Sequence, residues 1–241
     1  MRRWKYLLLA VLAIAAFAVA GAALMRPAPV ATTQPVPTTT IAPKKMPRLL
    51  VIGDSYSGGS NEGGNKEKGW PVLAQTQVTS DGSRLHLDLQ ARGGSGYVLV
   101  GPTGQNFQQA LASAKGAPYD VVLVFGSIND QPADVTSVDK AARDLYAAAL
   151  KASPKAELIV VGPSWMNDDP TPEVLAIRDV LRNAAAASRA TFVDPIADKW
   201  FMGEATQYIG KDGKHPTDAG HVYMADRLAP VIKKAVTSAS K

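Results

Sequence analysis

The chain has no cysteine among its 241 residues and only three histidines. The absence of cysteine excludes a disulfide framework, a thiolate nucleophile and a lipoprotein attachment site. Three scattered histidines offer no ligand cluster with the spacing of a familiar metal site, so we expect neither a metal nor another cofactor. The chain also lacks G-x-S-x-G, which argues against the nucleophile turn of α/β-hydrolases.

The body of the chain has no net positive charge, although the formal net charge of the whole chain is +5. Of the 26 Lys and Arg residues, seven lie in residues 1–48, where there is no acidic residue. The remainder has 19 basic against 21 acidic residues, a net charge of −2. A nearly neutral domain has no electrostatic footprint for phosphate backbones, so we expect no nucleic-acid partner.

Residues 1–26 have the charge and hydropathy order that directs a chain into a membrane. Three basic residues near the start precede an uncharged, mostly apolar run over residues 6–25. Such a run is just long enough to cross a bilayer core of roughly 30 Å, yet Ala18-Val19-Ala20 also matches a signal-peptidase site. We therefore expect a cleaved signal peptide or a retained membrane anchor, with the body outside the cytoplasm in both cases. A buried core helix, the alternative, leaves the basic flank unexplained.

A linker and one domain are expected after this segment. Residues 27–48 are rich in proline and threonine and lack hydrophobic periodicity, which is typical of a semi-extended linker. Residues 49–241 are enough for one domain with a substantial core.

The body alternates short apolar runs with segments of helical character. This alternation predicts an α/β fold, a three-layer αβα sandwich around a mostly parallel five-stranded sheet. In such sheets ligands bind beyond the carboxyl ends of the strands. The expected strands are 49–52, 85–89, 121–125, 158–161 and 191–193. The expected helices are 71–78, 107–115, 138–151, 172–188 and 217–236.

Three polar segments follow expected strands or precede the last helix. They are Gly53-Asp54-Ser55-Tyr56, Gly126-Ser127-Ile128-Asn129-Asp130 and Asp212-Gly213-Lys214-His215-Pro216. Alone, the first segment is equally typical of a turn or a helix N-cap, and the second is also typical of a turn. The carboxylate and imidazole of the third segment are three residues apart, so the acid can orient the ring while its other nitrogen takes a proton from a hydroxyl. A serine is the obvious donor.

The order of these segments, GDSY, GSIND and DGKHP, resembles the GDSL/SGNH hydrolase family over residues 49–236. The resemblance implies the flavodoxin-like SGNH hydrolase fold and a serine esterase or acyl hydrolase. Carried over residue by residue, it implies Ser55 as nucleophile, His215 as general base and Asp212 as the acid that orients it.

The resemblance also implies an oxyanion hole. Its donors are the backbone N–H of Ser55, the side-chain amide of Asn129 and the N–H of a glycine. For that glycine we choose Gly94, with Gly93 and Gly96 as alternatives, because the segment lacks the asparagine often found in the family's second motif.

Aromatic residues near the expected loops are candidates for substrate contact, although such rings more often belong to the core. Trp165 is the favoured candidate because it follows the fourth strand closely, ahead of Trp70 and Trp200. His86 lies within an expected strand and His221 within the last helix, so both are interpreted as structural.

The resulting prediction is an exported serine esterase that hydrolyses short-chain O-acyl esters, on a glycan of the cell envelope. A glycine-rich loop and short connections around the site leave little sequence for a long acyl tunnel. An O-acyltransferase to a sugar hydroxyl would use the same triad. A lipase or lysophospholipase is less favoured because no insertion suggests a lid. A non-catalytic envelope-binding module is also less favoured, because it would not need Ser55, Asn129, Asp212 and His215 together.

Overall fold

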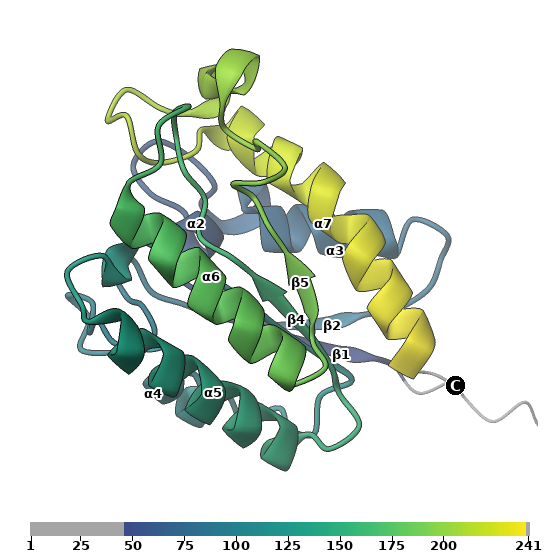
Figure 1. Cartoon of the computed structure of the whole chain (residues 1–241). Coiled ribbons are helices and arrows are strands. Elements are labelled where there is room, and N and C mark those ends of the chain that lie inside the picture. Colours follow the sequence, from purple (N-terminus) through teal and green to yellow (C-terminus); the bar gives the residue numbers. More distant parts are fainter. Residues whose placement is uncertain (1–45, 240–241) are drawn as a thin grey trace, which may run out of the picture. The chain divides into compact units, whose positions relative to one another are not determined.

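The computed structural model describes residues 46–239 (Figure 1). The expected signal peptide or anchor, residues 1–26, and nearly all of the expected linker, 27–48, lie outside the described residues. Arg48, which the sequence assigned to the end of the linker, is the first residue of strand β1 (Arg48–Gly53). Within the described part of the chain, no helix combines the length and the apolar character needed to cross a bilayer.

The centre of the domain is a sheet of five parallel strands in the order β2-β1-β3-β4-β5. The predicted fold class is confirmed. This order places the point where the chain changes direction across the sheet between β1 and β3, which is where open α/β sheets bind ligands. The strands other than β1 are β2 (His86–Ala91), β3 (Val121–Phe125), β4 (Glu157–Val161) and β5 (Thr191–Val193).

Helices cover both faces of the sheet (Figure 1). On one face α3 (Trp70–Val78) and α7 (Asp218–Ala239) pack against Leu49 and Val51 of β1. The next residues along the same strand, including Leu50, point to the other face. The helices on that second face are α4 (Phe107–Ser113), α5 (Val135–Ala152) and α6 (Pro172–Ala187). Side chains alternate across a strand, so β1 supplies apolar residues to two cores.

The structure differs from the sequence prediction mainly at element ends and in short helices. Helix α5 begins at Val135 rather than at residue 138, because the Asp134 side chain accepts a hydrogen bond from the backbone N–H of Ser137 and caps the helix. Four short helices were not predicted, since three to six residues are too few to show a hydrophobic period. They are α2 (Ser55–Gly58) and the 3₁₀ helices η1 (Lys66–Lys68), η2 (Ile128–Asp130) and η3 (Gly203–Tyr208).

Candidate active site

Ser55 is the first residue of the short helix α2, one residue after the interior strand β1 ends. The preceding Asp54 caps this helix, because its carboxylate accepts the backbone N–H of Tyr56 at 2.9 Å. The turn is tight: a Cβ added at Gly53 would lie 2.5 Å from the Oγ of Ser57. A glycine before Asp54 therefore lets β1 deliver Ser55 to the carboxyl edge of the sheet.

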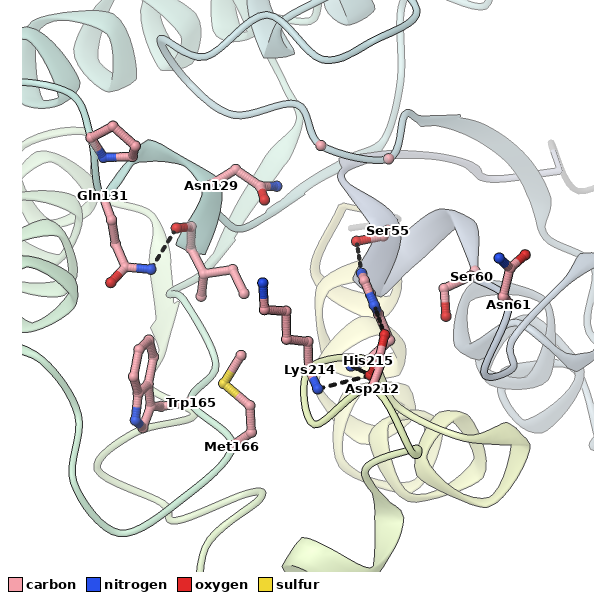
Figure 2. A pocket seen from close by; sticks show the side chains of 15 residues that line it. Ser55, Ser60, Asn61, Asn129, Gln131, Trp165, Met166, Asp212, Lys214 and His215 are labelled. Carbon is pink, nitrogen blue, oxygen red and sulfur yellow. Dashed lines mark hydrogen bonds and ion pairs between the residues drawn. The ribbon is translucent and has the colours of Figure 1, made fainter.

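His215 and Asp212 lie in the loop that precedes α7, and they meet Ser55 across 160 residues of sequence (Figure 2). The Nε2 of His215 is 2.9 Å from the Oγ of Ser55, and its Nδ1 is 2.5 Å from the Oδ2 of Asp212. The other carboxylate oxygen of Asp212 accepts the backbone N–H groups of Lys214 (2.8 Å) and His215 (2.9 Å). The structure thus brings together the three residues that the sequence assigned to the triad.

Hydrogen bonds keep the Asp212 carboxylate ionised. The backbone N–H of His215, followed by the His215 side chain and the N–H of Lys214, lowers the pKa of Asp212 to about 2. An ionised Asp212 favours the proton of His215 on Nδ1, so that Nε2 is free to accept a hydrogen bond from Ser55. The loop itself is fastened to the core by the hydroxyl of Tyr56, which donates to the carbonyl of Lys214 at 2.6 Å.

Asn129 lies in η2, after β3, and its side chain contacts both neighbouring loops. Its Nδ2 donates to the carbonyl of Ser95 at 2.8 Å and to the Oδ2 of Asp54 at 3.1 Å. Its backbone N–H donates to the Oγ of Ser127 at 2.9 Å. The amide orientation is therefore fixed, and both amide hydrogens have acceptors before any substrate binds.

Asp54 contacts a candidate site residue, Asn129, and the sequence analysis did not predict this contact. Asp54 is almost completely buried. Burial, with a smaller contribution from the charge of Asp130, raises the pKa of Asp54 to about 7 against the opposing effect of the Tyr56 N–H. Its contact with Asn129 spans 75 residues of sequence, and no local pattern indicated it.

The glycine-rich loop after β2 contains the three candidates for the oxyanion hole. Gly96 is not available, because its N–H donates to the carbonyl of Leu99 and an added Cβ would lie 2.4 Å from the carboxylate of Asp130. Gly93 and Gly94 both line the cleft, and neither N–H donates a hydrogen bond within residues 46–239. A Cβ at Gly93 would lie 3.9 Å from that of Ser55, whereas Gly94 faces Pro102.

A cleft of about 750 Å³ opens beside Ser55. Trp165 and Met166 lie on one side of it, and Ser60 and Asn61 on the other (Figure 2). The indole N–H of Trp165 donates to the side chain of Asn167 at 2.8 Å and to the carbonyl of Asp169 at 2.9 Å, which fixes the ring. Trp165 therefore lines the cleft, and its contact with substrate stays a prediction.

The remaining candidates do not line the cleft. Trp70 and Trp200 are buried in the core, which excludes them from the cleft surface. The Nδ1 of His221 accepts the backbone N–H of Trp70 at 3.2 Å, and burial lowers the pKa of His221 to about 4. His86 is exposed at the start of β2. In the part of the chain described here, no three His, Asp or Glu residues gather as metal ligands would.

Comparison with known proteins gives a consistent result. Residues 51–223 match the model of the GDSL-like lipase/acylhydrolase family. The chain is similar to a GDSL lipase of Mycobacterium tuberculosis, with 42% identity over 187 residues, 76% of this chain and 80% of that protein.

Solved structures show the same fold at low identity. A putative arylesterase from Agrobacterium tumefaciens is 19% identical, with a TM-score of 0.62 over 78% of this chain and 99% of that one. Est24, a carbohydrate acetylesterase from Sinorhizobium meliloti, is 16% identical, with a TM-score of 0.59 over 77% and 98% of the two chains.

Proposed function

The chain belongs to the GDSL-like lipase/acylhydrolase family and is a serine ester hydrolase, and on this premise we propose that Ser55, His215 and Asp212 form its catalytic triad. One observation carries the proposal: two consecutive hydrogen bonds, of 2.9 and 2.5 Å, join the hydroxyl, the imidazole and the carboxylate at the carboxyl edge of the sheet. These distances are within the reach that nucleophilic catalysis by serine requires.

In the first half of the reaction, Ser55 attacks the ester carbonyl while its proton passes to the Nε2 of His215. The ionised Asp212 stabilises the imidazolium that forms. The same proton then goes to the departing alcohol oxygen, and an acyl group remains on Ser55. In the second half, His215 removes a proton from a water molecule, the water attacks the acyl-enzyme, and Ser55 is released with its proton restored.

The negative charge that develops on the carbonyl oxygen needs fixed donors, each worth roughly 3 to 4 kcal/mol. The backbone N–H of Ser55 has no acceptor among the described residues and is the first donor. Among the glycines expected from the sequence, the close approach of Gly93 to Ser55 favours its N–H over that of Gly94. Asn129 is the third donor. Both amide hydrogens of Asn129 already have acceptors. The oxyanion therefore takes the place of the more distant acceptor, the Asp54 carboxylate at 3.1 Å.

The substrate that suits this cleft is a short acyl group on a polar alcohol. The large apolar side chains that line it, Ile128, Trp165 and Met166, face a polar side formed by Ser60 and Asn61. A cleft with one apolar and one polar side fits an acylated sugar better than an ester with two apolar halves. The structural similarity to a carbohydrate acetylesterase supports the same substrate class.

A chain-length series tests this substrate class. We expect kcat/KM for nitrophenyl esters to be highest for acetyl or another short acyl group, and we expect acetate release from an acetylated glycan. A maximum at a long acyl chain, without acetate release from glycan, would replace this function with that of a lipase, the name carried by the relative from Mycobacterium tuberculosis. Adding a sugar acceptor distinguishes an acyltransferase, because transfer would give an acylated sugar in place of free acid.

The proposal that the enzyme acts outside the cytoplasm rests on residues 1–26. Their basic residues precede an apolar run, as in a signal peptide or a membrane anchor. Fractionation of cells that express the full chain tests it. Activity in the membrane or the external fraction supports export, and a chain that begins at residue 48 should then remain in the cytoplasm. Equal distribution of the two forms would contradict an exported enzyme.

A further inference from the structure

The loop of residues 210–215 carries both the acid and the base of the triad, yet little of it is buried. Residues 211–214 are exposed, and His215 is partly exposed. The loop is closed at its base, because the N–H of Gly210 donates to the carbonyl of His215 at 2.8 Å. An exposed loop has few packing contacts to fix it, so its position depends on hydrogen bonds to the rest of the domain.

Besides the contact between His215 and Ser55, two side chains from outside hold this loop within residues 46–239. The hydroxyl of Tyr56 donates to the carbonyl of Lys214 at 2.6 Å, and the carboxylate of Glu62 accepts the N–H of Lys211 at 2.9 Å. Glu62 is partly exposed, so water competes for its hydrogen bond, whereas Tyr56 is only 3% exposed. Tyr56 is therefore the stronger of the two anchors.

The Tyr56 side chain is itself fixed by the core. Its ring packs against Phe125 and Phe201, with ring centroids 6.1 and 6.2 Å apart, and lies beside the imidazole of His215 at 6.3 Å. Burial raises the pKa of the Tyr56 hydroxyl, so the group keeps its proton and remains a donor. The anchor of the loop is thus a rigid group that is always able to donate.

The contacts between α2 and the loop change during the reaction. In the free enzyme, two successive residues of α2 contact two successive residues of the loop: Ser55 contacts His215, and Tyr56 contacts Lys214. Once Ser55 carries an acyl group, its Oγ has no hydrogen and cannot donate to the imidazole. The first contact is then lost, and the second remains.

We infer that Tyr56 is a positioning residue that keeps His215 in place in the acyl-enzyme, where this base must remove a proton from water. The inference rests on the proposed function, because an acyl-enzyme forms only if Ser55 is the nucleophile. A misplacement of about 1 Å can slow a step by about 10²-fold, so the loss of one buried hydroxyl can slow the second half of the reaction. In the first half the hydroxyl of Ser55 still holds the imidazole, and the need for Tyr56 is smaller.

The experiment separates the two halves of the reaction in the full-length protein and in Tyr56→Phe, which lacks the hydroxyl and keeps the ring. Titration with a fluorophosphonate first gives the amount of competent protein, so unfolded molecules are not counted as slow ones. The protein is then saturated with a nitrophenyl ester and quenched in the steady state, and mass spectrometry gives the acylated fraction of Ser55. Dividing kcat by this fraction gives the rate constant of deacylation, and dividing kcat by the unacylated fraction gives that of acylation. The acyl group, from acetyl to butyryl, is chosen so that both fractions are measurable.

We expect Tyr56→Phe to lower the rate constant of deacylation about tenfold or more and that of acylation about threefold or less, so that the acylated fraction rises. Tyr56→Met removes the hydroxyl with a flexible apolar side chain and should shift the two rate constants in the same way. The matched control is Tyr119→Phe. It removes another buried tyrosine hydroxyl, which donates to Asp88 near the amino end of β3, and both rate constants should equal those of the unsubstituted protein.

The ratio of the deacylation to the acylation rate constant decides the outcome. If this ratio is unchanged or raised in Tyr56→Phe and Tyr56→Met, the inference is overturned while the triad stands, because a general loss of structure does not act on one half of the reaction. Failure of the proposed function looks different: the unsubstituted protein would turn over the ester without acyl on Ser55, or not at all, and both ideas would fall together.

Discussion

The His215–Asp212 pair and the Asp54–Asn129 pair both lie beside Ser55, but the first is partly exposed and the second is mostly buried. The side chains of His215 and Asp212 are 28% and 35% exposed, and the two residues are three apart in one loop. Asp54 is 1% exposed, and its partner is 75 residues away on a different strand end. One pair is local and solvated, whereas the other connects separate parts of the sheet.

This difference indicates how each pair is tied to the fold. An exposed pair in one loop keeps its hydration when a partner is removed, so its loss affects the reaction and leaves the fold intact. A buried pair leaves an unsatisfied polar group when one member is lost, and that costs folding free energy as well. We therefore expect substitutions in the first pair to change activity alone and those in the second to change both.

The largest expected effect is that of His215→Gln. It removes the general base, so kcat should fall by roughly 10⁵-fold or more, while the free energy of unfolding should change by less than about 0.5 kcal/mol. The matched control is His221→Gln, in the same region but buried: it should lower the stability and keep kcat within a few-fold. Steady-state kinetics and urea unfolding of both variants measure this. A variant of His215 that is strongly destabilised would contradict the comparison.

Asp212→Asn should lower kcat by about 10⁴-fold. The amide can donate to the Nδ1 of His215, which stabilises the wrong tautomer and leaves Nε2 unable to accept the proton of Ser55. The stability should again change little, because the side chain is a third exposed. Retention of more than a tenth of the activity would show that another group orients His215.

Stability as a function of pH isolates the buried pair. The pKa of Asp54 is raised from 3.8 to about 7 by burial, so the folded protein holds this proton more tightly than the unfolded chain does. The contribution of Asp54 to stability should therefore decrease as the pH rises from about 4 to 7, by up to about 4 kcal/mol. The measurement is the difference in unfolding free energy between the unsubstituted protein and Asp54→Asn across this range. A difference that is independent of pH would show that the pKa of Asp54 is the same in the folded protein as in the unfolded chain.

Asn129→Ala should affect both properties by smaller amounts. The loss of one oxyanion donor should lower kcat roughly a hundredfold, with labelling of Ser55 by a fluorophosphonate retained. The carbonyl of Ser95 and the carboxylate of Asp54 lose their donor, which should cost about 1–3 kcal/mol of stability. If turnover is unchanged, Asn129 is not part of the oxyanion hole.

The same difference explains what the sequence could and could not predict. The five strands follow from short apolar runs and the larger helices from the segments of helical character between them. The position of Ser55 follows from a polar segment after a buried strand. Asp212 and His215 were predictable because their contact is local. The acceptor role of Asp54 was not, because the Asn129 amide reaches it only after β1 and β3 pair. The structural role of Gly96 likewise depends on the distant carboxylate of Asp130.

The most direct test of the account is the identity of the residue that carries the acyl group. The protein is mixed with nitrophenyl acetate, quenched within the first turnovers and digested, and the acetylated peptide is identified by mass spectrometry. The account predicts acetyl on Ser55, its absence from Ser55→Ala, and its retention in Ser60→Ala, a matched change in the same cleft. Acetyl on another serine, or a Ser55→Ala protein that still acylates and turns over, would contradict Ser55 as the nucleophile.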